Sequence, residues 1–214
     1  MMNYVEQLNN LGSRPYLFSY RRCPYAMRAR MALVDSKIEF DVYEISLRNK
    51  PNEMLNISAK GTVPILRLNK LVLDESLDIM KWAYKNSKSK HSDLLEPGDK
   101  KIADELVALN DGKFKNSLDS YKYFERYPEK SKVEHRKSCY FFLDILEKRL
   151  EITSFLISNT RTYSDICIFP FIRQFMNVDK EWFDNSEYKR VKKWLALLIE
   201  SNLFKMAMIK PTFS

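Results

Sequence analysis

The sequence predicts two domains of different class, an α/β domain of residues 1–86 and an all-helical domain of residues 99–214, joined by a polar linker of residues 87–98. Three observations support this division. Patterns typical of strands and helices alternate up to residue 86, whereas later residues have almost only the periodicity of helices. The linker is polar and contains a Pro-Gly pair, as domain boundaries commonly do. Only four glycines occur in 214 residues, which favours long helices.

The first domain is expected to contain its elements in the order strand, helix, strand, short helix, strand, strand, helix. The strands are short apolar or alternating segments, at residues 15–20, 38–45, 63–68 and 71–74. The helices have apolar residues at helical spacing, at residues 24–34, 51–58 and 75–86. Pro24 suits the first turn of a helix, where a missing N–H is tolerated. Only Asn69 and Lys70 separate the last two strands, which predicts an antiparallel hairpin.

The second domain is expected to be a bundle of helices. The helical segments are residues 99–126, 131–150, 163–178 and 186–207. Short breaks with Pro128, Pro170 and polar clusters are expected between them. Thr162 and Asp165 have the spacing of a capping box, in which two residues at a helix start exchange hydrogen bonds between side chain and backbone.

The positive charge of the chain is spread evenly rather than concentrated. The formal net charge is +8, and the first 86 residues hold 13 Lys and Arg against 9 Asp and Glu, while the remainder holds 23 against 19. Each part is therefore +4 with interleaved signs, as on a solvated surface. No run of five or six basic residues occurs. We therefore do not expect nucleic acid as a partner, and a small anionic ligand explains a local excess of positive charge equally well.

Several classes of protein are disfavoured by what the sequence lacks. No stretch of about 18 apolar residues indicates a membrane span, and the N-terminus does not have the pattern of a signal peptide, so we expect a cytoplasmic protein. The three cysteines, Cys23, Cys139 and Cys167, are odd in number and have no metal-ligand spacing. With only two histidines in addition, we expect no disulfide framework, no metal site and no histidine-based triad.

Cys23 is the strongest candidate for a reactive group. It directly precedes Pro24 at the expected start of a helix, where free backbone N–H groups and the positive end of the helix dipole favour a thiolate. Four nearby arginines add positive charge: Arg21, Arg22, Arg28 and Arg30. The alternative is an inert buried cysteine, since free cysteine is among the most buried residue types. We favour the reactive interpretation for Cys23 and expect Cys139 and Cys167, which stand in apolar runs, in the core.

Three short motifs make the chain resemble the glutathione transferase superfamily. They are Cys23-Pro24 after a strand, Thr62-Val63-Pro64 before a strand, and Asp74-Glu75-Ser76 at a helix start. With the all-helical second half, the resemblance covers nearly the whole chain, and the cysteine places it nearest the omega-like and glutaredoxin-like cysteine branch. The resemblance implies an N-terminal thioredoxin-like domain that binds glutathione as co-substrate, a C-terminal helical bundle, and a homodimer. It also implies that the capping box serves folding of the second domain.

The resemblance further implies a glutathione site made of Lys50, Val63, Pro64, Glu75 and Ser76. A cis peptide bond before Pro64 lets the Val63 backbone pair with glutathione as an added strand does. Ser76, at a helix start, then binds the γ-glutamyl carboxylate and Glu75 the γ-glutamyl ammonium, while Lys50 lies near the glycyl end. Each residue also has an ordinary interpretation, because trans prolines, helix caps and surface lysines are common.

The expected function is that of a glutathione-dependent thiol transferase or reductase. Ala26 stands where a dithiol glutaredoxin has its second cysteine, so exchange must proceed through a mixed disulfide of Cys23 with an external thiol. Dehydroascorbate-reductase-like activity belongs to the same expectation. Two alternatives stay open: a conjugating transferase that uses Ser19 or Tyr20, and a non-catalytic binding protein of the stringent-starvation type, a partner of the transcription or translation machinery. A chloride intracellular channel ranks last, because no apolar helix supports insertion.

Overall fold

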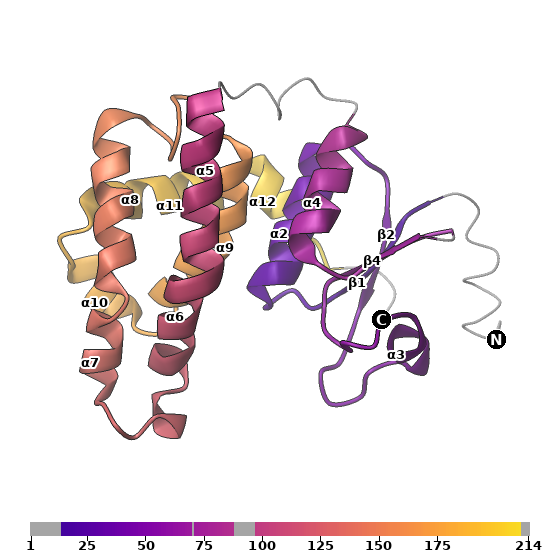
Figure 1. Cartoon of the computed structure of the whole chain (residues 1–214), viewed down its shortest axis with the longest axis horizontal. Helices are drawn as coiled ribbons and strands as arrows, with labels where there is room; N and C mark the ends of the chain where they lie inside the picture. Colours follow the sequence, from indigo (N-terminus) through magenta and orange to yellow (C-terminus); the bar gives the residue numbers. More distant parts are fainter. Residues whose placement is uncertain (1–13, 70, 88–96, 211–214) are drawn as a thin grey trace. The chain divides into compact units, whose positions relative to one another are not determined.

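The structure is a computed structural model that describes residues 14–69, 71–87 and 97–210. The chain divides into two compact units, Met1–Ser89 together with Met206–Ser214, and Lys90–Lys205. Most of the expected linker, residues 88–96, lies outside the described residues. The expected fold class is confirmed, because an N-terminal thioredoxin-like domain with a four-stranded sheet precedes a C-terminal helical domain (Figure 1).

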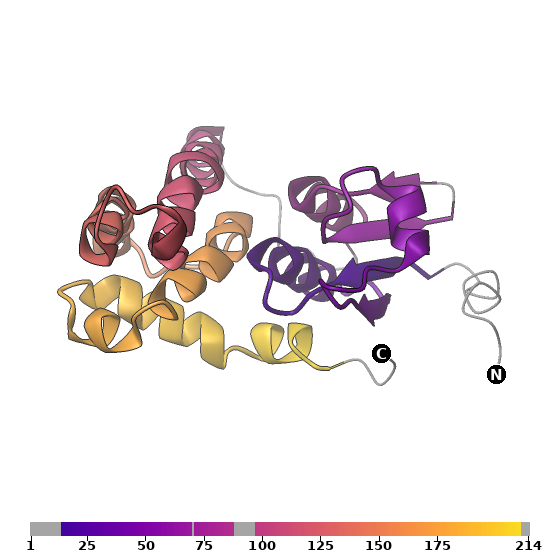
Figure 2. The ribbon, with the colours of Figure 1, turned by 90° about the horizontal axis from the view of Figure 1, so that it is seen from below.

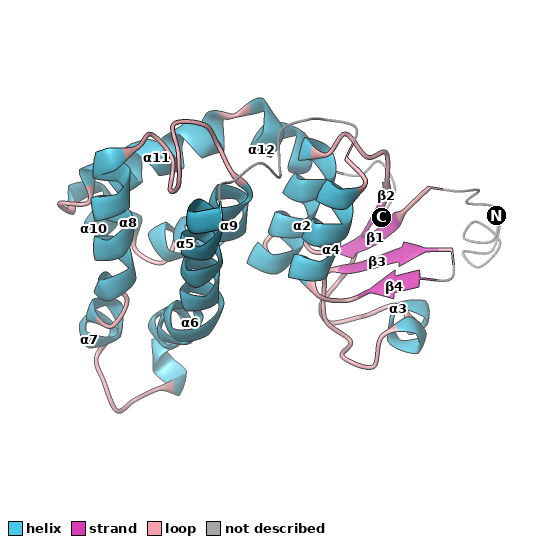
Figure 3. Cartoon of the chain, turned by 45° about the horizontal axis from the view of Figure 1, so that its top comes forward, coloured by secondary structure: helices cyan, strands magenta, loops and turns pink. Residues whose placement is uncertain are grey.

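The first unit is built on a mixed sheet with the strand order β2-β1-β3-β4 (Figure 3). Its strands are β1 Tyr16–Ser19, β2 Asp41–Glu44, β3 Ile65–Leu68 and β4 Leu71–Leu73. β1 runs parallel to β2, which requires the crossover that helix α2 (Pro24–Asp35) provides. β3 pairs antiparallel with both β1 and β4, so the expected hairpin is confirmed, although Lys70 in its turn lies outside the described residues.

Helix α2 is a core helix of the first unit. It lies side by side with α4 (Ser76–Lys85), and the short helix α3 (Asn52–Ile57) completes the unit (Figure 1, Figure 2). Side chains on almost every side of α2 are buried, two arginines among them. Cys23 precedes the helix directly and packs against a buried apolar cluster that includes Phe18 and Ile65. The crossover from β1 thus places the candidate thiol at the edge of the core.

The described part of the second unit consists of helices and connecting segments, and the last helix continues to Ala207, two residues beyond the unit's boundary at Lys205. Its elements are α5 Pro97–Leu109, the π-helical turn η1 Asn110–Phe114, α6 Lys115–Lys122, the 3-10 turn η2 Phe124–Arg126, α7 Lys132–Lys137, α8 Tyr140–Ile152, α9 Tyr163–Met176, α10 Lys180–Asn185, α11 Lys189–Glu200 and α12 Asn202–Ala207. Pro170 lies inside α9 and not in a break, and α10 is an additional helix. The expected helix 131–150 is divided into α7 and α8 at Ser138 and Cys139, and the expected helix 186–207 is divided at Ser201. This residue has an extended backbone, and its Oγ accepts a hydrogen bond from Phe204 N at 3.2 Å, so it starts α12 instead of continuing α11.

The expected capping box at the start of α9 is confirmed. Thr162 N donates to Asp165 Oδ2 at 2.8 Å, and the carboxylate is fully buried. The other oxygen, Oδ1, accepts from Leu156 N at 3.0 Å and from Trp194 Nε1 on α11 at 2.9 Å. Burial raises the pKa of Asp165, while these hydrogen bonds act in the opposite direction. Asp165 therefore joins three segments of the second unit.

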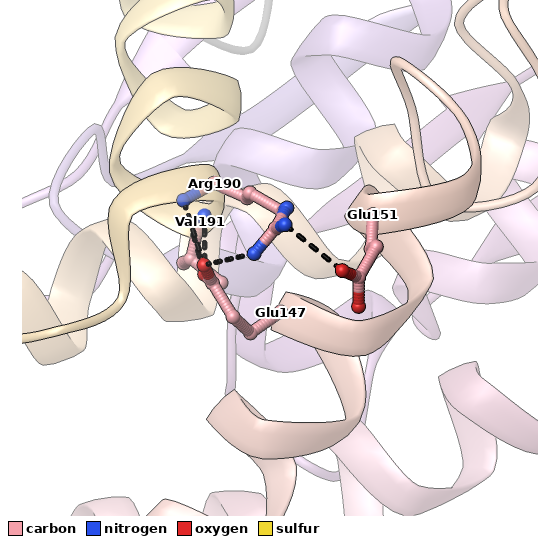
Figure 4. Close-up of polar contacts among 4 residues, drawn as sticks. All are labelled: Glu147, Glu151, Arg190 and Val191. Atoms are coloured by element: carbon pink, nitrogen blue, oxygen red, sulfur yellow. Dashed lines mark hydrogen bonds and ion pairs between the residues drawn. The ribbon is translucent and has the colours of Figure 1, made fainter.

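A carboxylate of the neighbouring helix α8 caps the N-terminus of α11. The N-cap residue Tyr188 makes no side-chain capping bond. Instead, Glu147 of α8 accepts hydrogen bonds from Arg190 N at 3.0 Å and from Val191 N at 2.9 Å (Figure 4). The Arg190 guanidinium in turn lies 3.5 Å from Glu147 Oε1 and 3.0 Å from Glu151 Oε1. A negative charge at the positive end of α11 stabilises that helix.

Candidate functional site

Cys23 is the N-cap residue of α2. Its backbone is extended, with φ −81° and ψ 123°, and Pro24 follows as the first helical residue. Cys23 N donates to Tyr20 O at 2.9 Å, and Cys23 O accepts the first helical bond from Met27 N at 2.9 Å. The side chain makes no capping bond and is half-buried. The thiol therefore stands at the positive end of a twelve-residue helix with part of its surface accessible, which is the setting of reactive cysteines.

The other two cysteines have a different environment. Cys139 and Cys167 are fully buried, which confirms that they belong to the core. The Cys139 thiol donates to the backbone oxygen of His135 at 3.8 Å. Burial raises the pKa of Cys139 to about 12, so this group stays a neutral thiol near pH 7.

The segment Val63-Pro64 lies directly against Cys23. The peptide bond between these two residues is cis, as expected. Cys23 Sγ donates to Val63 O at 3.8 Å, although 40 residues separate the two in sequence. Both residues pack on the same apolar cluster. The backbone of Val63 therefore offers a main chain beside Cys23 with which an extended ligand attached to the thiol can align.

Ser76 is the first residue of α4 and is almost fully buried. Its N-cap, Glu75, has an extended backbone and makes no side-chain capping bond. The Ser76 hydroxyl accepts a hydrogen bond from Arg28 Nη1 at 3.3 Å, and the Arg28 side chain is fully buried. From the sequence, Arg28 is only one of several arginines near Cys23. The available signal was its position inside the apolar run of α2, where a surface arginine is not expected.

Glu75 is exposed and already has a partner. Lys60 Nζ donates to Glu75 Oε1 at 2.5 Å and lies 3.4 Å from Asp74 Oδ1, while Ser58 Oγ donates to Asp74 Oδ2 at 2.7 Å. The hydrogen bond to Glu75 raises the pKa of Lys60, and the bond from Ser58 lowers the pKa of Asp74. A ligand ammonium at Glu75 therefore has to share this carboxylate with Lys60.

Lys50 lies between the Ser46–Asn49 bridge and Pro51, the N-cap of α3. Its side chain is half-buried. None of the hydrogen bonds and ion pairs among residues 14–69 and 71–87 joins Lys50 to Cys23 or Ser76.

Two of the four arginines near Cys23 contact Glu44 on β2. Glu44 on β2 accepts from Arg21 N at 2.7 Å and from Arg30 Nη1 at 3.3 Å. Arg30, almost fully buried, also donates to Ile209 O at 2.8 Å and to Ala207 O at 2.5 Å, and its burial lowers its pKa. Arg30 thus holds the end of the chain on the first unit, and the Arg21 side chain lies 3.5 Å from Glu44 Oε1.

Neither a cluster of residues that could bind a metal ion nor a helix that could span a membrane is found in the part of the chain that the structure describes. Within it, no group of three or more His, Cys, Asp and Glu residues is arranged to hold a metal ion. None of its helices is long and apolar enough to cross a membrane.

Comparison with protein families gives matches over both units. Residues 17–91 match the model of the glutathione S-transferase N-terminal domain, and residues 135–197 match that of the C-terminal domain. A similar curated protein is glutathione S-transferase U28 from Arabidopsis thaliana, with 27% identity over 203 residues, 89% of this chain and 86% of the relative.

Solved structures share the fold at low sequence identity. The glutathione transferase from Pseudomonas putida, solved with one glutathione disulfide bound per subunit, has a TM-score of 0.80 at 17% identity, covering 97% of this chain and 96% of its own. A glutathione transferase family member from Pseudomonas fluorescens, solved with two glutathione molecules bound, has a TM-score of 0.79 at 16% identity, covering 97% and 98%. At this identity the likeness establishes the fold alone.

Proposed function

Because the chain belongs to the glutathione S-transferase superfamily, we propose that it is a glutathione-dependent thiol transferase of the omega-like cysteine type, with Cys23 as its catalytic residue. The observation that carries the proposal is the position of the thiol. Cys23 is the half-buried N-cap of α2, and its Sγ lies 3.8 Å from the backbone oxygen of Val63. A helix N-terminus favours the thiolate, and the adjacent main chain offers a place for a peptide ligand.

The reaction takes place in two thiol–disulfide exchanges. The Cys23 thiolate attacks the glutathione sulfur of a mixed disulfide, the S–S bond breaks, and the other thiol leaves with the electron pair and takes up a proton. A second glutathione thiolate then attacks the glutathione sulfur bound to Cys23. This step forms glutathione disulfide and regenerates the Cys23 thiolate. External glutathione has to perform it, because Ala26 stands where dithiol enzymes have a second cysteine.

The rest of glutathione is bound on both sides of Cys23 in this proposal. The cysteinyl part aligns with the Val63-Pro64 backbone beside the thiol. The γ-glutamyl carboxylate binds the Ser76 hydroxyl and the backbone N–H groups at the start of α4, which Glu75 does not cap. Glu75 receives the ammonium in competition with Lys60, and Lys50 receives the glycyl carboxylate.

The broader assignment has further parts. We propose dehydroascorbate-reductase-like activity as one form of the same chemistry, a cytoplasmic location, a homodimeric state and no requirement for a metal ion. A conjugating transferase is disfavoured at one position, because Ser19 is fully buried in β1 and its hydroxyl is not available to a bound thiol. Tyr20, which is half-buried, keeps that alternative testable. The third alternative is a non-catalytic binding protein.

An assay with three substrates separates these functions. Wild type, Cys23→Ala and Tyr20→Phe are compared with glutathione and each of a glutathione mixed disulfide, dehydroascorbate and chlorodinitrobenzene. We expect turnover of the first two substrates by wild type and Tyr20→Phe and none by Cys23→Ala. Conjugation of chlorodinitrobenzene that persists in Cys23→Ala and disappears in Tyr20→Phe would favour the conjugating enzyme. Absence of all three activities, in a protein that is folded, would favour the binding protein.

A further inference from the structure

Arg28 is a fully buried arginine next to the candidate γ-glutamyl subsite. A guanidinium without contact to water is costly unless charged or polar groups compensate its desolvation. One compensating contact is the hydrogen bond from Nη1 to Ser76 Oγ at 3.3 Å, with both side chains buried. A buried charge retained beside a candidate ligand-binding hydroxyl requires an explanation beyond packing, because an apolar side chain of similar volume avoids the desolvation cost.

The position of Arg28 links the two ends of the site. It lies five residues after Cys23 on α2, a rise of about 7.5 Å along the helix axis. Its guanidinium carbon is 5.6 Å from the centre of the Tyr25 ring, in the first turn of the helix that carries the thiol. The same guanidinium contacts the first residue of α4. Arg28 therefore spans from the helix of the thiol to the helix of the γ-glutamyl subsite.

The hydrogen bond fixes what the Ser76 hydroxyl is able to do. A guanidinium only donates, so Ser76 Oγ acts as the acceptor in this pair. The hydroxyl hydrogen is then directed away from Arg28 and serves as a donor to another acceptor. Nearby, the first turn of α4 directs backbone N–H groups outward, and Glu75 gives them no side-chain cap. This arrangement of donors with a positive charge behind them suits a carboxylate.

We propose that Arg28 is a positioning residue for glutathione: it orients the Ser76 hydroxyl toward the γ-glutamyl carboxylate and adds a buried positive charge behind it. Arg28 acts through Ser76 and through its field. The inference rests on the proposed function, since it assumes that glutathione binds at the start of α4. It predicts an effect on one chemical group of the ligand only.

Binding measurements with two ligands test this prediction. Dissociation constants of glutathione and of γ-aminobutyryl-cysteinyl-glycine, which lacks the α-carboxylate of the glutamyl group, are determined by calorimetry. The proteins are wild type, Arg28→Met, Arg28→Lys, Ser76→Ala and the double variant Arg28→Met/Ser76→Ala. Arg67→Met is the matched control, because this partly buried arginine of β3 pairs with Glu53 and has no part in the proposed site. Far-UV circular dichroism confirms that each variant is folded.

We expect Arg28→Met to weaken glutathione binding by about tenfold, in the range of one charge-assisted hydrogen bond, and to leave binding of the truncated ligand within about twofold. Arg28→Lys retains the charge and loses less affinity. In the Ser76→Ala background the Arg28→Met change costs less than about threefold, because the orienting effect on the hydroxyl is already lost there and only the field of the guanidinium remains to be removed. Arg67→Met binds both ligands as wild type does.

Equal losses for both ligands, or no loss for either, would overturn the inference. So would additive effects of Arg28→Met and Ser76→Ala. If Arg28→Met fails to fold, Arg28→Lys with Ser76→Ala supplies the same comparison, and equal losses for the two ligands overturn the inference there as well. A wild-type protein that binds neither ligand would contradict the proposed function itself. If wild type binds both ligands but each variant weakens the binding of the two ligands equally, only the role of Arg28 is contradicted.

Discussion

Two helix N-termini of the first unit differ from two of the second unit in how they are capped. In the first unit, α2 begins at Cys23 and α4 follows Glu75, and neither of these residues makes a side-chain capping bond. In the second unit, buried Asp165 caps α9 and Glu147 closes α11 from a neighbouring helix. The donors at the positive end of a helix are thus bound by a carboxylate of the protein at α9 and α11, whereas the N-cap side chains of α2 and α4 make no such bond.

This difference indicates where ligand chemistry belongs. A carboxylate inside the protein that satisfies the donors of a helix start leaves nothing for an external anion. Cys23, a half-buried N-cap residue without a capping bond, does the opposite, since its sulfur gains from the dipole but stabilises the helix little, whereas Cys139 at the start of α8 is fully buried. We therefore interpret the starts of α2 and α4 as places where a ligand can bind, and the starts of α9 and α11 as structural.

The largest expected effect concerns Cys23 at the N-terminus of α2. Replacement Cys23→Ala is expected to lower thiol-transfer activity about a thousandfold or more, because the covalent intermediate cannot form. Initial rates with a glutathione mixed disulfide measure the effect. Cys139→Ala, at a buried and protonated thiol, is the control and should keep its activity per folded molecule. Full activity of Cys23→Ala would contradict the assignment of α2 as the reactive end.

The next largest effect concerns the capped N-terminus of α9. Asp165→Ala removes a carboxylate that accepts from Leu156 N, Thr162 N and Trp194 Nε1, and it leaves these buried donors without their partner. We expect the free energy of unfolding to fall by about 3–5 kcal/mol, measured by urea denaturation. The matched control is Asp184→Ala on α10, whose carboxylate is exposed, with an expected change below about 0.5 kcal/mol. A change in Asp165→Ala as small as that of the control would mean that the cap is dispensable.

A smaller effect is expected at α11. Glu147→Gln keeps the size of the side chain but removes the negative charge that accepts from Arg190 N and Val191 N. The expected loss in free energy of unfolding is about 1 kcal/mol, as for other helix caps. Glu151→Gln, which affects only the ion pair with the Arg190 side chain, should change stability by less than about 0.5 kcal/mol. Equal losses in the two variants would attribute the effect to the ion pairs and not to the cap.

The smallest expected effect tests whether the missing side-chain cap at the N-terminus of α2 lowers the free energy of unfolding. Serine is a good N-cap residue, and the extended backbone of Cys23 already suits a cap. Cys23→Ser should therefore unfold with a free energy about 0.5–1 kcal/mol above that of Cys23→Ala, while both variants lack thiol transfer. Thermal or urea denaturation of the two variants side by side decides the point. A serine variant no more stable than the alanine variant would show that a hydrogen-bonding N-cap side chain does not stabilise α2.

The elements that depend on local pattern were predictable from the sequence. The order of strands and helices in the first unit, the start of α2 at Pro24 and the capping box of α9 follow from apolar spacing and from residues no more than a few positions apart. The second strand was expected over residues 38–45 but pairs only at Asp41–Glu44, because its length is set by the four residues of β1 opposite it. The division of the last helix at Ser201 had a local signal, since serine competes for helical hydrogen bonds.

The features that join distant residues were not predictable in this way. Arg28 meets Ser76 across 48 positions, Glu147 meets Arg190 across 43, and Arg30 meets Ala207 across 177. Each depends on how elements pack rather than on spacing along the chain. The partner of Glu75 was also not foreseen, because Lys60 reaches it from the loop before β3. The candidate site was therefore predicted as a set of residues, and the contacts that organise it came from the structure.

The most direct test of the account is the reaction of the protein with glutathione disulfide, followed by intact and peptide mass spectrometry on wild type and Cys23→Ala. The account predicts one glutathione adduct per chain, located on Cys23, removed by excess glutathione and absent from the variant. Cys139 and Cys167 should stay unmodified until the protein is unfolded, because both are buried. An unmodified wild type, or adducts only on Cys139 or Cys167, would contradict the assignment of Cys23 as the catalytic residue.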